Sequence, residues 1–159
     1  MPKPDAHEEY DRARLDALMV DSVQGFTRYC GFTPTRLEPG RCVARIEVRA
    51  HHLQQDGYVH AGVIATLADH TAGYAAYSLA PEGGRVLSVE FKINLLAPGD
   101  ATGLECRAKV IKPGRRIMVV ESDVFGQTAD DEKLIAKALL TMAVVPSDKL
   151  RPAVNTPRS

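Results

Sequence analysis

The sequence predicts an α+β fold in which one antiparallel, curved sheet of five to six strands wraps around a single long central helix. Two observations carry this prediction. The stretch from Gln54 to Ala80 has the composition of a helix that is apolar on nearly every side, and four segments with strand-like alternation follow it at hairpin spacing. A helix of this kind must be buried, and the sheet is the cover that the chain offers. The order of elements excludes a doubly wound parallel fold, in which helices alternate with strands.

The residues before the central helix predict one more helix and one strand. From about Ala6 to Tyr29, apolar residues recur at helical spacing, as expected for an amphipathic surface helix; they are Leu15, Leu18, Met19, Val23 and Phe26. Between Arg41 and Arg49, apolar and charged residues alternate, as in a strand with one face in water. We therefore divide the chain into an N-terminal helix and linker (1–40), a main domain (41–145) and a loose C-terminal tail (146–159).

The central helix is expected to begin near Val59 or His60, after an Asp56-Gly57 turn, and to end before Pro81. Alternation then predicts strands at 87–95, 104–110, 116–125 and 134–144. In the first of these, the apolar residues are expected on one face and the polar residues on the other; the apolar set is Leu87, Val89, Phe91, Ile93 and Leu95, and the polar set is Ser88, Glu90, Lys92 and Asn94.

Composition narrows the class of protein. With 159 residues, 45% of them apolar, the chain has the size of one domain. Lys plus Arg equals Asp plus Glu at 20 each, so no global charge draws it to nucleic acid or to an acidic membrane. The polar, acidic N-terminal residues do not resemble a signal peptide, and three cysteines without CxxC spacing fit reduced thiols. We expect a cytoplasmic protein that binds no metal, no nucleic acid and no membrane.

Asp69 is the one acidic residue within the predicted central helix, which is otherwise almost entirely apolar. An unpaired ionised carboxylate in an apolar interior costs several kcal/mol, so a buried helix seldom keeps one without a use. We interpret Asp69 as a catalytic carboxylate. The alternative is a structural carboxylate bonded to Thr66, His70 or a neighbouring amide.

Two blocks of sequence carry a family resemblance. In the first, from Gln54 to Asp69, His60-Ala61-Gly62 opens the helix; in the second, Leu87-Ser88-Val89 is followed by Leu96-Ala97-Pro98-Gly99. With these blocks, residues 41–145 resemble hotdog-fold acyl-CoA thioesterases of the phenylacetate-pathway (PaaI-like) type. The resemblance implies hydrolysis of an acyl- or aryl-CoA without a metal or organic cofactor, by a homodimer or a homotetramer.

The resemblance also implies roles for single residues. Asp69 takes the place of the helix carboxylate that acts as nucleophile or activates water, and the N–H of Ala61 that of the amide that polarises the thioester carbonyl. Gln54 matches a residue that positions water or substrate, and Ser88 matches a serine or threonine that assists. Ala61 departs from the family pattern, which has glycine there.

Physical reasoning supports part of this assignment independently. The start of a helix offers unpaired N–H groups and a partial positive charge, and His60, Ala61 and Gly62 lie there. Along one helix, however, Ala61 and Asp69 are eight residues apart, about 12 Å at 1.5 Å per residue. One thioester cannot easily reach both, so we expect each site to combine two subunits.

A basic cluster across one predicted hairpin turn suits the phosphates of coenzyme A; it consists of Lys109, Lys112, Arg115 and Arg116. The alternative interpretation of these four residues is a solvated turn without a ligand.

Two other functions stay open. One is a non-catalytic acyl-CoA sensor, and the other is a hotdog dehydratase or hydratase, although the His-Phe-Pro-Gly block typical of one such group is absent. Ser78 has no G-x-S-x-G elbow, which argues against a serine hydrolase.

Overall fold

The computed structural model describes residues 6–150, with side chains from residue 11 onward. The elements in chain order are α1 (Ala6–Asp21), α2 (Gly25–Tyr29), β1 (Thr33–Glu38), β2 (Arg41–Glu47), η1 (Ala50–His52), α3 (Ala61–Tyr77), β3 (Gly84–Leu95), β4 (Gly103–Lys112), β5 (Ile117–Gln127), β6 (Glu132–Pro146) and η2 (Ser147–Lys149). The loose tail expected at 146–159 is wrong in its first part, because β6 continues to Pro146 and η2 follows it; residues 151–159 lie outside the described residues.

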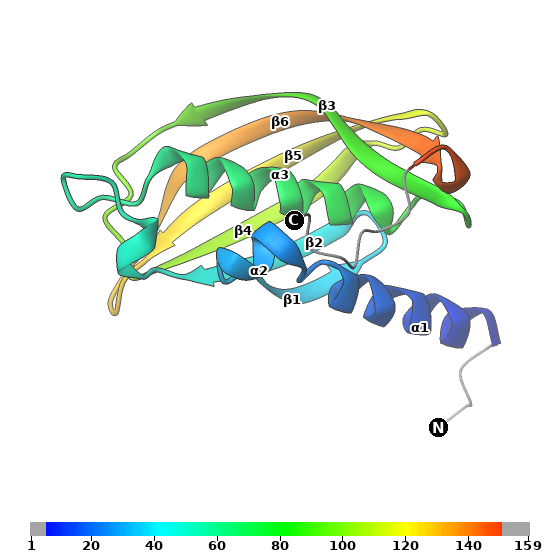
Figure 1. The fold of residues 1–159 in the computed structure, drawn as a ribbon, viewed down its shortest axis with the longest axis horizontal. Helices are drawn as coiled ribbons and strands as arrows, with labels where there is room; N and C mark the ends of the chain where they lie inside the picture. The colour runs from blue at the N-terminus through cyan, green and yellow to red at the C-terminus, as the bar shows by residue number, and fades with distance from the viewer. Residues whose placement is uncertain (1–5, 151–159) are drawn as a thin grey trace, which may run out of the picture.

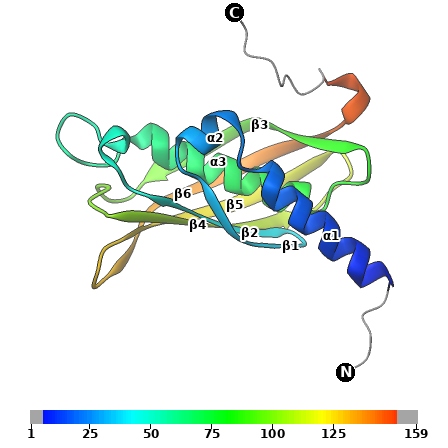
Figure 2. The same cartoon turned by 60° about the horizontal axis from the view of Figure 1, so that its bottom comes forward.

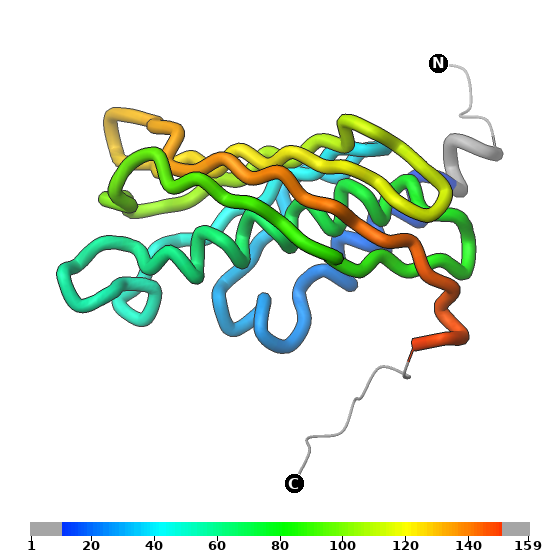
Figure 3. The backbone as a smooth tube through the Cα atoms, turned by 90° about the horizontal axis from the view of Figure 1, so that it is seen from above, coloured from blue at the N-terminus to red at the C-terminus, as the bar shows by residue number. Residues whose placement is uncertain are grey.

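The six strands form one antiparallel sheet in the order β1-β2-β4-β5-β6-β3, and α3 lies along its concave face (Figure 1). Seen from above, the strands make one layer and the helices a second (Figure 3). This confirms the predicted fold class.

The core forms where α3 meets the sheet. The helix turns a row of fully buried alanines toward the strands, among them Ala68, Ala72 and Ala75, and their small side chains let the helix backbone come close to the sheet. Leu104 and Leu140 fill the space between them from the strand side. Leu67 of α3 is fully buried too, and the strands also contribute small residues such as Ala136, so large and small side chains from both surfaces interlock.

One side of α3 stays open in the single chain. Ala61 and Gly62 are exposed, and Thr66, Asp69 and Gly73 are half-buried along the same side of the helix. The expectation that the helix is buried all round is therefore wrong for one chain, because the sheet covers only part of the helix circumference. No other segment of residues 6–150 covers this side of the helix.

The N-terminal region differs from the single helix expected between residues 6 and 29. Helix α1 ends at Asp21, and the chain turns at Gly25 before α2. The φ of Gly25 is +53°, a value that is strained for residues with a side chain. The two helices α1 and α2 then lie beside α3 (Figure 2). Phe26, expected on the buried face, is 65% exposed.

Strand β1 lies in the segment that we expected to be a linker. It pairs with β2, and its register is interrupted between Pro34 and Arg36. Its burial does not alternate, because this interruption breaks the pleat. A pattern search for period two therefore misses it.

The other edge of the sheet is β3, which is long and apolar. Its 12 residues pair on one side with β6 and on the other side with nothing among residues 6–150. Leu87, Val89, Phe91 and Leu95 are all about half exposed. An unprotected apolar edge of this length is a template for pairing with another chain.

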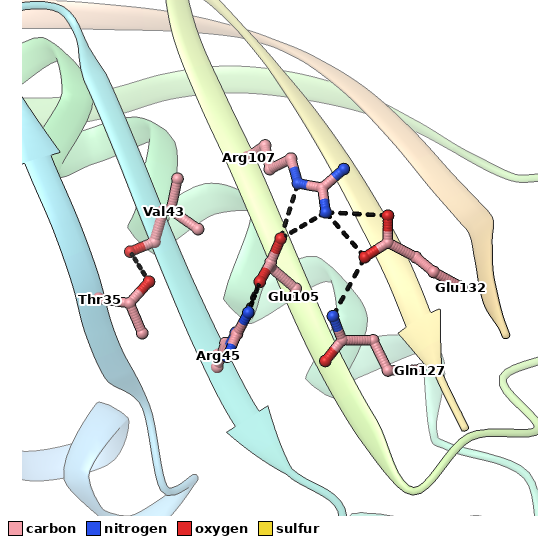
Figure 4. A network of polar contacts seen from close by, with 7 residues as sticks. All are labelled: Thr35, Val43, Arg45, Glu105, Arg107, Gln127 and Glu132. Atoms are coloured by element: carbon pink, nitrogen blue, oxygen red, sulfur yellow. Dashed lines mark hydrogen bonds and ion pairs between the residues drawn. The ribbon is translucent and has the colours of Figure 1, made fainter. Parts of the chain in front are cut away.

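The outer face of the sheet is held by a charged network (Figure 4). Glu105, only 4% exposed, accepts hydrogen bonds from Arg45 (2.6 Å) and Arg107 (2.7 Å), and Arg107 also binds Glu132 at 2.7 Å. The Arg107 guanidinium lies 4.2 Å from the ring centroid of Phe125. Because both arginines neutralise Glu105, the carboxylate can be buried between β2 and β4.

Two further observations concern the expected class of protein. Within residues 6–150, no helix has both the length and the hydropathy needed to cross a membrane. The three cysteines are free and buried, and burial raises the pKa of Cys42 and of Cys106 to about 12.

Candidate active site

The site begins at the N-terminus of α3, where His60 is the capping residue. His60 Nδ1 accepts a hydrogen bond from the Gly62 N–H at 2.8 Å, and the His60 carbonyl accepts one from the Val63 N–H at 2.9 Å. The ring therefore carries its proton on Nε2. Among residues 6–150, the Ala61 N–H donates to no acceptor, so it is the one donor of this first turn that His60 leaves for another molecule.

Glycines allow this cap to form. A Cβ on Gly62 would lie 3.0 Å from His60 Nδ1, which would push the imidazole away from its acceptor position. Gly99 accepts a hydrogen bond from the Val59 N–H at 2.9 Å, and a Cβ there would lie 3.0 Å from the Val59 side chain. The Leu96-Ala97-Pro98-Gly99 block thus packs against the residue before His60 and fixes where the helix begins.

Asp69 lies two turns further along α3, on its open side, and meets Ser88 of β3. The Ser88 hydroxyl donates to Asp69 Oδ1 at 2.6 Å. The expected alternative partners do not bind it: Thr66 donates to the Gly62 carbonyl at 2.8 Å, and His70 Nε2 lies 2.8 Å from the Ser22 carbonyl. Asp69 is half-buried rather than fully buried, so a substrate can approach it.

A bulge in β3 brings Ser88 to this position. Ser88 is opposite Met142 of β6, but Glu90 is opposite the adjacent Thr141, so Val89 is an extra residue. Ser88 therefore shares the inner face with Phe91, whereas simple alternation would put them on opposite faces. The predicted division of β3 into two faces is wrong because of this bulge, which is a common device for re-aiming a side chain beside a site.

Gln54, His60 and Ala61 line one groove, which we call the Gln54 groove. It has a volume of about 690 Å³, and Leu95 and Leu96 are also among its lining residues. Gln54 Oε1 accepts a hydrogen bond from the Asp56 N–H, which shapes the loop before the helix. The structure thus brings three of the predicted site residues together.

A second groove, which we call the aromatic groove, lies on the other side of His60. It has a volume of about 400 Å³, and its walls include Phe26 and Tyr29 of α2, Leu53, and Thr66 of α3. Sequence reasoning missed it because these residues are distant in the chain. The sequence feature that could have indicated this groove is the pair Phe26 and Tyr29, two aromatic residues close together in a segment predicted to be a surface helix.

The four basic residues predicted to form one cluster are separated. Lys109 points to the outer face of the sheet, beside Arg41 of β2. Arg115 and Arg116 instead line a groove with Lys149, near Gly83 and Gly84, beyond the C-terminal end of α3. Lys112 is exposed at the end of β4. They diverge because successive strand residues face opposite ways and the turn reverses the chain.

Metal ligation finds no support in this part of the chain. No group of three or more His, Cys, Asp or Glu side chains within residues 6–150 is arranged to hold a metal ion. The expectation of a reaction without metal or organic cofactor stays a prediction. The chemistry that this arrangement offers is a carboxylate positioned by a hydroxyl and, elsewhere on the same helix, a free N–H at a helix start.

Comparison with known proteins connects this geometry to one family. The model of the thioesterase superfamily matches residues 56–132. A 1,4-dihydroxy-2-naphthoyl-CoA hydrolase from Listeria monocytogenes is 32% identical over 121 residues, which are 76% of this chain and 95% of that protein.

Solved structures agree. A thioesterase family protein from Silicibacter pomeroyi superposes with a TM-score of 0.80 at 33% identity, covering 83% of this chain and 98% of that one. A mutant of the phenylacetic acid degradation protein PaaI from Thermus thermophilus superposes with a TM-score of 0.66 at 27% identity, covering 74% of this chain and 96% of that one.

Proposed function

The chain belongs to the thioesterase superfamily and is a thioester hydrolase, and we propose that it cleaves an acyl- or aryl-CoA to the free acid and coenzyme A, with Asp69 as base or nucleophile. The observation that carries the proposal is the Asp69 carboxylate, held by Ser88 at 2.6 Å on the open side of α3. Such a carboxylate is ready to act on a substrate that arrives from that side.

The proposed reaction follows from the two groups. Asp69 takes a proton from water while the water oxygen attacks the thioester carbonyl carbon, and the Ala61 N–H stabilises the negative charge that moves to the carbonyl oxygen. The C–S bond then breaks and the proton passes to the departing sulfur. If Asp69 is instead the nucleophile, its carboxylate attacks the carbonyl carbon, the C–S bond breaks to release coenzyme A as the thiolate, and water then hydrolyses the mixed anhydride to the free acid and Asp69.

The proposed active unit is at least a dimer, with the Ala61 N–H of one chain facing Asp69 of the other. Two observations support this. The two groups lie eight residues apart on one helix, about 12 Å along its axis, which is too far for one carbonyl group. The apolar edge of β3 and the open side of α3, which includes Gly73, both lack a cover within the described chain.

Coenzyme A carries phosphates, and the proposal assigns them to Arg115 and Arg116. Both line the groove that also contains Lys149, so three cations meet there, with Glu82 as the one acidic residue among its lining. Lys109 lies beside Glu121 on the outer face and serves as the comparison residue. Phosphate contacts made equally in the ground state and transition state affect KM more than kcat.

The test of the proposed function is the Asp69→Asn variant on a panel of acyl-CoA and aryl-CoA thioesters, with release of the free thiol as readout. The amide is nearly isosteric but is neither a base nor a comparable nucleophile, so kcat should fall about 100-fold or more while the fold is kept. Near-normal kcat in the folded variant would refute the role of Asp69. Binding without turnover of any panel member by the unmodified protein would favour an acyl-CoA sensor.

A further inference from the structure

Two grooves meet at the start of α3, and the candidate oxyanion donor lies between them. The Gln54 groove contains Ala61, the aromatic groove contains Gly62, and His60 lines both. A thioester whose carbonyl oxygen accepts the Ala61 N–H has its acyl group on one side and its sulfur on the other. Each half of the substrate therefore has its own groove.

The linings of the two grooves differ in chemistry. The Gln54 groove presents the side-chain amides of Gln54 and Gln55, which match the two amide groups of the pantetheine arm of coenzyme A. The aromatic groove presents Phe26, Tyr29 and Leu53, which offer rings and a branched alkyl group. Its smaller volume, about 400 Å³, is near the lower end for pockets that hold small molecules.

We infer that the aromatic groove receives the acyl group of the substrate and that Phe26 and Tyr29 of α2 select an aryl group there. The inference rests on the proposed function, since it concerns the same reaction. It adds the substrate class and assigns a role to a helix outside residues 41–145.

Exposure of the two rings supports a ligand. Phe26 is 65% exposed and Tyr29 is 70% exposed, although each would gain free energy by leaving water. The Tyr29 ring also lies 5.5 Å from that of His51, tilted by 46°, so the wall already contains an aromatic pair. A flat aryl group can extend this pair, whereas a flexible alkyl chain gains less from ring faces.

The position of α2 is fixed well enough for such selection. The Thr27 side chain is buried, and its hydroxyl lies 2.9 Å from the carbonyl oxygens of both Ser22 and Gln24, which share its one proton. The Phe32 N–H donates to the Thr27 carbonyl at 2.9 Å. These bonds hold the short helix while its two aromatic side chains remain free for contact. Substituting Phe26 or Tyr29 should leave the fold intact, because neither side chain is packed in the core.

The experiment compares benzoyl-CoA and phenylacetyl-CoA with hexanoyl-CoA in the full-length protein. Phe26→Ala and Tyr29→Ala should each lower kcat/KM for the aryl substrates about 3- to 10-fold more than they lower kcat/KM for hexanoyl-CoA, the range of one aromatic contact beyond its buried area. The control is Val20→Ala on α1, a 77% exposed residue outside both grooves, which should change neither. Equal losses for both substrate classes, or no loss, would overturn the inference while the proposed function stands.

A binding measurement separates the inference from turnover. The chain has no tryptophan, so Phe26→Trp introduces a single reporter, placed in the Asp69→Asn background to prevent hydrolysis. Benzoyl-CoA should change the emission of this tryptophan, while coenzyme A alone should not; Val20→Trp is the matched control. An unchanged emission at saturating benzoyl-CoA would refute the inference, and absence of turnover of any thioester by the unmodified protein would refute the proposed function as well.

Discussion

Replacing Ala61 by proline removes one hydrogen-bond donor and changes little else. Ala61 is the first residue of α3, a position where proline is favoured because its fixed φ suits the helix start. His60 before it has φ −62° and ψ 136°, the extended conformation that a residue preceding proline requires. The Ala61 N–H donates to no acceptor among residues 6–150, so no hydrogen bond within this region is lost.

The expected effect is large on catalysis and small on stability. Removing one oxyanion-hole donor typically lowers kcat about 100- to 1000-fold, which corresponds to about 2.7–4 kcal/mol of transition-state stabilisation. The free energy of unfolding should change by less than about 1 kcal/mol, since proline at a compatible position loses little. Ala61→Gly is the control: it keeps the N–H and should retain most activity.

The assay measures kcat by thiol release and the free energy of unfolding by urea titration of the same preparations. A folded Ala61→Pro protein with kcat within threefold of the unmodified chain would refute the assignment of this N–H. Mixing inactive Ala61→Pro chains with inactive Asp69→Asn chains then tests the shared site. After subunit exchange, mixed dimers should regain one working site of two, and no recovery despite demonstrated exchange would exclude a site built from two chains.

Three further predictions follow from the same geometry. Ser88→Ala should lower kcat about tenfold, the value of a charge-assisted hydrogen bond at a partly exposed site, but should have no further effect in the Asp69→Asn background; additive losses would show that Ser88 does not act through Asp69. Arg115→Ala with Arg116→Ala should raise KM for CoA substrates several-fold more than it lowers kcat, and an unchanged KM would leave these residues as a solvated turn. Burial lowers the pKa of His70 below the value of about 6.5 in the unfolded chain, so the unfolded state binds more protons below pH 6.5 and stability falls as the pH drops through that window; His70→Gln should flatten the decline in urea titrations at pH 5–7, and an identical slope would contradict this.

Much of the fold was accessible from sequence because the helix and most strands are local patterns. The apolar stretch around Asp69 predicted the start of α3 to within about two residues and its end to within about three, and period-two alternation predicted β2, β4, β5 and β6. The choice of Asp69 also needed only local reasoning, since a carboxylate in an otherwise apolar helix is conspicuous wherever the helix lies. The family resemblance pointed to Ser88 as a residue that assists, and in the structure Ser88 contacts Asp69.

What only the tertiary structure decided depends on pairing between distant residues. The bulge at Val89 is visible only against the register of β6, and without it the faces of β3 are assigned wrongly. The cations at Lys109 and Arg116 are seven residues apart yet belong to different surfaces, because the faces of the strands and the turn between them set their directions. The aromatic groove joins Phe26 to the start of α3, more than 30 residues later, through a chain reversal at Gly25 that no periodicity predicts. Periodicity reports which residues share a face, whereas the partner that each face meets is set by long-range packing.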